Sequence, residues 1–114
     1  MRTVVITGGS RGIGAACVRV FAQAGWRAAF LYRAAQPDAE ALAAETGALA
    51  LQADVRDSAQ VNRAFTAALA QLGHIDALVN NAGVSLNCLL QDTTDEQWRE
   101  VLDVNLTGAF YATR

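Results

Sequence analysis

The chain contains 114 residues, of which 53% are hydrophobic and 18% charged, as expected for one soluble globular domain. Its formal net charge is −2 and the charged residues are scattered, which argues against a nucleic-acid partner. No apolar run has the length of a membrane span and no signal-peptide pattern precedes the first strand, so we expect a cytoplasmic protein. Neither cysteine, nor His74, has a companion at metal-ligand spacing, and no metal site is predicted.

The first element is a strand that runs into a cluster of glycines. Val4, Val5 and Ile6 predict a buried strand, and the segment TVVITGGSRGIG then opens a helix whose apolar residues recur at helical spacing from Ile13. Gly25 is expected to cap this helix in the left-handed conformation. Side-chain-free residues before a helix N-terminus expose N–H groups and the positive end of the helix dipole, which suits a phosphate. The alternative is a tight turn whose glycines serve only positive φ or close packing.

The rest of the chain alternates between strand and helix patterns. Strands are predicted at residues 27–33, 48–54 and 75–83, and helices at residues 38–46, at 58–72 and from Thr94, with a small loop at Gln36 and Pro37. Alternation of this kind indicates βαβ units in a parallel sheet with helices on both faces. The predicted fold class is α/β, doubly wound, with strand order 3-2-1-4.

This order places the first strand beside the fourth, at the switch point where ligands bind outside the carboxyl ends of the strands. The loops GGSRG and NNAG would line one crevice there, and the next strand tips add Tyr32, Arg33 and Asp54. Because separate segments converge on one crevice, the sequence predicts a nucleotide-cofactor site.

Four motifs together resemble those of the short-chain dehydrogenase/reductase family. They are TGGSRGIG (Thr7–Gly14), DV (Asp54, Val55), NNAG (Asn80–Gly83) and NLTGAF (Asn105–Phe110), in the family's order and spacing over the whole chain. The segment from NNAG to NLTG leans toward 3-oxoacyl-carrier-protein reductases within that family. The resemblance implies a Rossmann-type fold and homo-oligomers, with the final helix as a dimerisation element.

The resemblance also assigns roles to individual residues. Gly8, Gly12 and Gly14 would form the pyrophosphate loop, Asp54 and Val55 would hold the adenine, and Asn80–Gly83 would brace the sheet and pass beside the cofactor ribose. The cofactor-binding residues expected on these grounds are Thr7, Gly8, Ser10, Arg11, Gly12, Ile13, Gly14, Tyr32, Arg33, Asp54, Val55, Asn81, Ala82 and Gly83.

Charge at the second strand tip indicates which cofactor is preferred. Many dinucleotide-binding sheets place an acid there for the ribose 2′-hydroxyl, and its carboxylate would repel a 2′-phosphate. Here the tip reads Tyr32-Arg33-Ala34, and Arg11 in the glycine loop faces it, so two guanidiniums could clamp that phosphate. NADP(H) is therefore favoured over NAD(H). The alternative is that both arginines are ordinary solvated charges.

The last helix has a well-marked start, because the segment from Thr93 to Gln97 offers two overlapping capping boxes. Trp98, Asn105 and Ala109 share one helical stripe, which predicts a buried amide at Asn105 that needs hydrogen-bond partners. Two roles stay open for this amide. It could join the helix to the sheet, or, as the resemblance implies, Asn105 could be catalytic and hold a water of the proton relay.

The family's chemistry, hydride transfer between nicotinamide and a carbonyl or alcohol carbon, needs further residues. The resemblance implies a serine and a Tyr-x-x-x-Lys motif after Asn105, whereas neither Tyr32 nor Tyr111 has a lysine at that spacing and all nine basic residues are arginines. The fourth strand would also be left as an apolar sheet edge. We therefore interpret residues 1–114 as the incomplete cofactor-binding half of an NADP(H)-dependent oxidoreductase for a small carbonyl or alcohol substrate. Two alternatives are a non-catalytic NADP-binding module and a degraded reductase retained for protein interaction.

Overall fold

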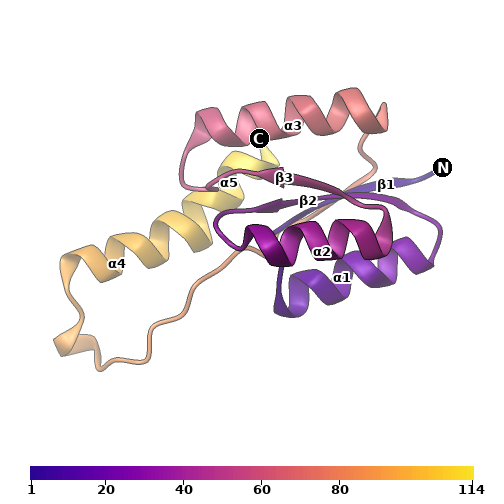
Figure 1. Cartoon of the computed structure of the whole chain (residues 1–114). Coiled ribbons are helices and arrows are strands. Elements are labelled where there is room, and N and C mark those ends of the chain that lie inside the picture. The colour runs from indigo at the N-terminus through magenta and orange to yellow at the C-terminus, as the bar shows by residue number, and fades with distance from the viewer.

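A four-stranded parallel sheet forms the centre of the computed structural model, which describes residues 1–114 (Figure 1). The strand order is β3-β2-β1-β4, which confirms the predicted order. Val5 in the central strand lies opposite Ala29 of β2 and Leu78 of β4. The strands are β1 (Thr3–Thr7), β2 (Arg27–Tyr32), β3 (Leu49–Gln52) and β4 (Ala77–Val79).

Helices cover both faces of this sheet (Figure 1). The full set is α1 (Gly12–Gln23), α2 (Gln36–Thr46), α3 (Ser58–Leu72), the 3-10 turn η1 (Leu90–Asp92), α4 (Asp95–Leu102), the π-helical segment η2 (Asp103–Thr107) and α5 (Gly108–Thr113). Helices α1 and α2 lie on one face, α3 lies on the other beside α5, and α4 extends away from the sheet (Figure 1). None of these helices combines the length and apolar character that crossing a bilayer requires.

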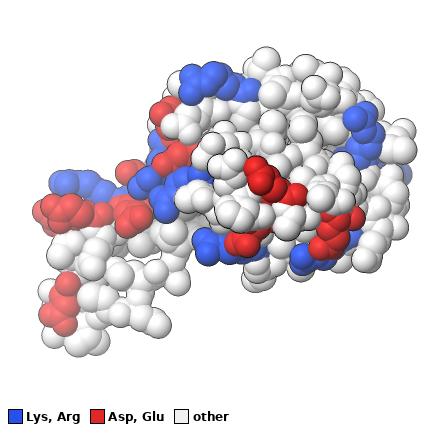
Figure 2. All heavy atoms as spheres, viewed as in Figure 1, with Lys and Arg blue, Asp and Glu red and all other residues white.

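The core is divided by the sheet, because side chains alternate between its two faces. Val4, Ile6 and Phe30 pack with α1 and α2, whereas Val5 and Leu31 pack with α3. All five residues are almost completely buried, as apolar strands covered on both sides should be. Basic and acidic side chains are intermixed over the molecular face in Figure 2, without a broad patch of one sign.

Three predicted elements have different boundaries in the structure. Helix α2 begins at Gln36, so the small loop predicted at Gln36 and Pro37 is wrong. Proline suits this first turn, because the missing N–H has no intrahelical partner there in any case. Strand β3 has four residues and β4 only three, both shorter than the sequence pattern predicts. After β4 the backbone N–H groups of Asn81 and Ala82 bond to the Thr7 side chain instead of continuing the sheet ladder.

The end of the chain also departs from the predicted pattern. Thr94 and Gln97 form the expected capping box at the start of α4. The buried stripe predicted through Trp98 and Asn105 is wrong, because both residues are exposed. Helix α4 extends away from the sheet, and the π-helical segment then widens one turn, so the residues that face the sheet change. The buried positions are Val104, Gly108 and Ala112.

Candidate cofactor site

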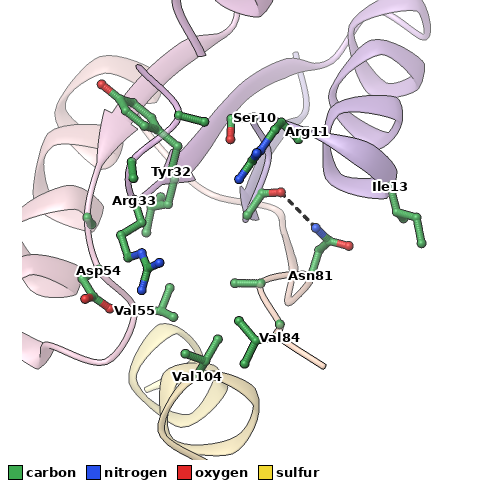
Figure 3. Close-up of a pocket in the computed structure, with 17 residues that line it drawn as sticks. Ser10, Arg11, Ile13, Tyr32, Arg33, Asp54, Val55, Asn81, Val84 and Val104 are labelled. Carbon is green, nitrogen blue, oxygen red and sulfur yellow. Dashed lines mark hydrogen bonds between the residues drawn. The ribbon is translucent and has the colours of Figure 1, made fainter. Parts of the chain in front are cut away.

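A cavity of about 400 Å³ opens at the carboxyl ends of the strands, where the glycine loop meets the segment after β4 (Figure 3). Eleven predicted cofactor residues line it: Gly8, Ser10, Arg11, Ile13, Tyr32, Arg33, Asp54, Val55, Asn81, Ala82 and Gly83. They come from four separate segments of the chain. The structure therefore brings together most of the cofactor residues predicted from the sequence.

The glycine loop is packed so tightly that side chains would not fit at three of its positions. A Cβ on Gly9 would overlap the Phe30 side chain of β2. Gly8 has φ +67°, and a Cβ placed there would come 2.8 Å from Ala82 Cα. A Cβ on Gly14 would overlap the Gly8 carbonyl and lie 2.6 Å from Asn81 Nδ2. These glycines let β1, α1 and the segment after β4 approach one another, which is the close-packing role.

Gly12 differs from them. It also has positive φ, +58°, but open space surrounds its Cβ position. A ligand can therefore approach the backbone closely at this point, where helix α1 begins.

Helix α1 presents an uncapped N-terminus at the cavity. Its N-cap residue, Arg11, makes no side-chain cap hydrogen bond, and the first turn contains no acidic residue. The first N–H groups of a helix have no intrahelical partner and lie at the positive end of its dipole. With Ser10 and Ile13 also lining the cavity, this arrangement fits a pyrophosphate.

Two side chains fix the glycine loop against the segment after β4. The buried Thr7 hydroxyl oxygen accepts hydrogen bonds from the N–H groups of Asn81 and Ala82, at 3.1 and 3.0 Å. Asn81 Nδ2 donates to the Gly8 carbonyl at 3.0 Å, the dashed contact in Figure 3. Thr7 does not line the cavity, and its contacts show a positioning role.

The tip of β2 supplies the basic end of the cavity. Arg33 lines the cavity and takes part in no ion pair, while Gln52 donates to its carbonyl oxygen. Arg11 is exposed and lies 4.0 Å from Asp38, a distance at which the pair contributes little. The Tyr32 ring packs against the core cluster on the α1 and α2 face. Two guanidiniums thus lie at the cavity without a strong partner, and the aromatic ring is largely structural.

Asp54 is the single acid among the residues that line the cavity, and it is paired. Arg56 donates to both of its carboxylate oxygens, with Nη2 to Oδ2 at 2.7 Å and Nε to Oδ1 at 3.0 Å. The hydrogen bonds from Arg56 hold the pKa of Asp54 below its ordinary value, and the nearby charge of Arg33 lowers it further. Asp54 is therefore a carboxylate at neutral pH.

Asn105 lies outside the cavity lining and bonds to the segment after β4. Its Oδ1 accepts from the Val84 N–H and its Nδ2 donates to the Val84 carbonyl, both at 2.8 Å. This pair supports the helix-to-sheet role, one of the two that the sequence leaves open. Thr7, Gly12 and Gly14 are the other predicted residues that do not line the cavity themselves.

Six lining residues are not predicted from the sequence: Leu31, Ala34, Ala35, Ala53, Val84 and Val104. Ala34 and Ala35 directly follow the predicted β2 tip, so the strand end itself is the signal that could have found them. Val104 has no such signal, because the π-helical segment brings it to the cavity.

Comparison with known proteins decides the family. A family model described as short chain dehydrogenase matches residues 2–114. The chain belongs to the short-chain dehydrogenase family. Among curated relatives, the 3-oxoacyl-[acyl-carrier-protein] reductase MabA of Mycobacterium bovis is 39% identical over 109 residues, covering 96% of this chain and 41% of the relative.

Solved structures of similar proteins share the fold of this short-chain dehydrogenase chain. A 3-ketoacyl-(acyl-carrier-protein) reductase from Brucella melitensis, complexed with NADH, gives a TM-score of 0.95 at 33% identity, covering 99% of this chain and 47% of that one. A blue fluorescent protein from a metagenomic library, in complex with NADPH, gives 0.91 at 42% identity, covering 97% and 48%. The chain thus spans about half the length of its short-chain dehydrogenase relatives.

Proposed function

We propose that these residues form the cofactor-binding half of an NADP(H)-dependent oxidoreductase. The observation that carries the proposal is the cavity itself, where a glycine-rich loop, an uncapped helix N-terminus and two arginines meet at the carboxyl end of the sheet. Membership of the short-chain dehydrogenase family supports the same function.

The residues divide the cofactor between them in this proposal. The N–H groups at the start of α1, reached past Gly12, hold the pyrophosphate. Asp54 and Val55 border the adenine, and the segment from Asn81 to Gly83 runs beside the ribose. The chemistry supplied by the bound nicotinamide is hydride transfer to a carbonyl carbon or from an alcohol carbon.

The proposed substrate is a small carbonyl or alcohol compound, with a 3-oxoacyl thioester as the leading candidate. Similarity to MabA, a 3-oxoacyl-[acyl-carrier-protein] reductase, supports this choice. Residues beyond this chain would have to supply the serine and the Tyr-x-x-x-Lys motif. Asn105 would hold a water of the proton relay with the donor and acceptor capacity that its two bonds to Val84 leave unused.

NADP(H) is preferred in this proposal because the β2 tip carries Arg33 and no acid. Arg11 of the glycine loop also lines the cavity, and Figure 3 shows its side chain beside Ser10 and the Arg33 guanidinium beside Asp54. A 2′-phosphate would gain charge-assisted hydrogen bonds from these guanidiniums, whereas a 2′-hydroxyl would not. The relatives with bound NADPH and bound NADH leave both cofactors within the family's range.

We further propose a cytoplasmic homo-oligomer. Helix α4 and the loop before it carry exposed apolar side chains, with Leu89, Leu90 and Trp98 exposed by 65%, 81% and 54%. Apolar surface of this kind is typical of protein interfaces.

A non-catalytic NADP-binding module is the second candidate, since the cavity accounts for cofactor binding without any catalytic residue. Titration of the 114-residue chain with NADPH and NADH tests cofactor binding, which both candidate functions require. We expect NADPH to bind at least about tenfold more tightly than NADH. Arg33→Asp should reverse that preference, because a carboxylate repels the 2′-phosphate and accepts from a 2′-hydroxyl. Equal affinities in the unmodified chain would exclude the arginine clamp, and no binding of either cofactor would favour an interaction protein.

A further inference from the structure

At one end of the cavity an acidic residue lies beside one of the two arginines of the proposed clamp. Asp54 and Arg33 both line this end, and Figure 3 shows the Arg33 guanidinium extending toward Asp54. Opposite charges in a partly enclosed site attract more strongly than in water. If Asp54 captured Arg33, the guanidinium would be held away from a 2′-phosphate and its charge would be offset.

Arg56 occupies Asp54 from outside the cavity. It belongs to the loop before α3, does not line the cavity, and binds Asp54 through Nε, Nη2 and its own backbone N–H. The pair is partly shielded from water, since the Arg56 and Asp54 side chains are 35% and 22% exposed. A guanidinium matches a carboxylate with two parallel hydrogen bonds, which makes this pair geometrically specific.

Further acidic residues, from α4 and η2, lie on the other side of Arg56. Arg56 Nη1 lies 4.0 Å from Glu100 Oε1, and the charge of Asp103 also acts on the guanidinium. Arg33, in contrast, has no ion-pair partner within 4.0 Å. The hydrogen bonds to Asp54 thus hold Arg56, the acids of α4 and η2 add a weak attraction, and Arg33 has no ion pair.

We infer that Arg56 is a specificity-determining positioning residue, which neutralises Asp54 and so keeps Arg33 available for the 2′-phosphate of NADP(H). The inference rests on the proposed function, and it assigns a role to a residue that does not line the cavity. This role differs from that of a purely structural ion pair. Loss of a purely structural ion pair would weaken the binding of both cofactors alike. Loss of the charge that neutralises Asp54 would weaken the binding of NADPH selectively.

The test is the ratio of the NADH to the NADPH dissociation constant, measured on the full chain. We expect Arg56→Gln to lower this ratio about threefold to tenfold. The double variant Asp54→Asn with Arg56→Gln should have the same ratio as Asp54→Asn alone, because without the Asp54 carboxylate the loss of Arg56 no longer affects Arg33. Arg63→Gln is the matched control, since Arg63 is an exposed arginine of α3 without an ion pair.

An unchanged ratio in Arg56→Gln would overturn the inference. So would a ratio in the double variant that lies below the ratio in Asp54→Asn. Should Arg56→Gln not fold, Arg56→Lys gives the second test, because its ammonium still offsets Asp54 and the ratio should stay within about twofold. A ratio lowered in Arg56→Lys as far as in Arg33→Ala would equally reject the inference. The proposed function is judged separately, by whether the unmodified chain prefers NADPH and loses that preference in Arg33→Ala.

Discussion

The side-chain amide of Asn105 bonds to both backbone polar groups of Val84, at 2.8 Å each, and so ties the π-helical segment to the chain after β4. These two hydrogen bonds resemble a pair of β-sheet hydrogen bonds in which a side-chain amide takes the place of a backbone peptide group. Gly83 lies next to it, and a Cβ there would come 3.2 Å from Asn105 Oδ1. The backbone that borders the cavity is therefore held from the α4–α5 side as well as from the glycine loop.

Asn105→Ala should release this backbone. We expect it to lower the free energy of unfolding by about 1 kcal/mol, since two hydrogen bonds are lost at an exposed site. Hydrogen exchange of the Val84 amide, followed by NMR, should become faster. Asn62→Ala on α3 is the control, because the Asn62 side chain is exposed and makes no hydrogen bond. Unchanged exchange at Val84 would show that the Asn105 amide does not protect it.

Gly8→Ala should destabilise the protein more than Gly47→Ala. Both glycines have positive φ, +67° and +75°, so each substitution adds backbone strain of roughly 1 to 2 kcal/mol. Only at Gly8 would the new Cβ also meet backbone, 2.8 Å from Ala82 Cα, whereas the space at Gly47 is open. Overpacking adds about 1 to 3 kcal/mol at Gly8. Urea unfolding measures both variants, and equal losses would contradict the close packing at the glycine loop.

Local patterns are enough to predict the strand order and most of the cavity. Val4, Val5 and Ile6 are apolar because they are covered on both faces, and a parallel sheet places the strand tips at one edge. The residues at those tips, such as Arg33 and Asp54, can therefore be assigned to one crevice from the sequence alone.

The exposure of Asn105 cannot be predicted in the same way. A helical stripe assumes a constant turn, and the π-helical segment Asp103–Thr107 breaks that assumption. Gly108, which follows this segment, packs closely against the loop before α3, since a Cβ there would come 2.8 Å from Val55 Cγ2. The pairing of Asp54 with Arg56 likewise depends on the turn between them and not on a sequence period.

Asp76→Asn should make stability less sensitive to acid. The Asp76 carboxylate accepts the Thr3 N–H at 2.8 Å and lies 3.0 Å from His74 Nε2, and the Thr3 hydrogen bond is the main cause of its lowered pKa. A carboxyl whose pKa is lower in the folded state stabilises the fold above its unfolded pKa, about 4, and loses that contribution as pH falls.

We therefore expect the free energy of unfolding to fall between about pH 5 and pH 2, and less steeply in Asp76→Asn. Urea unfolding at a series of pH values measures the slope. Asp92→Asn is the control, because the exposed Asp92 side chain has no ion pair or hydrogen bond. An identical acid slope in Asp76→Asn and the unmodified chain would reject the assignment.

The chain spans about half the length of its relatives, so an oxidoreductase of their length that contains this cofactor site should have roughly twice the 12.1 kDa mass of residues 1–114. Strand β4 pairs only with β1, and beside it a groove of about 500 Å³ is lined by apolar side chains of α3, β4 and α5, including Phe65, Leu78 and Tyr111. An apolar strand edge of this kind favours a further covering element. The intact mass of the purified natural protein decides between the two candidate functions. A mass near 12.1 kDa would leave it without the Tyr-x-x-x-Lys motif and would favour the NADP-binding module, whereas the doubled mass would support the oxidoreductase.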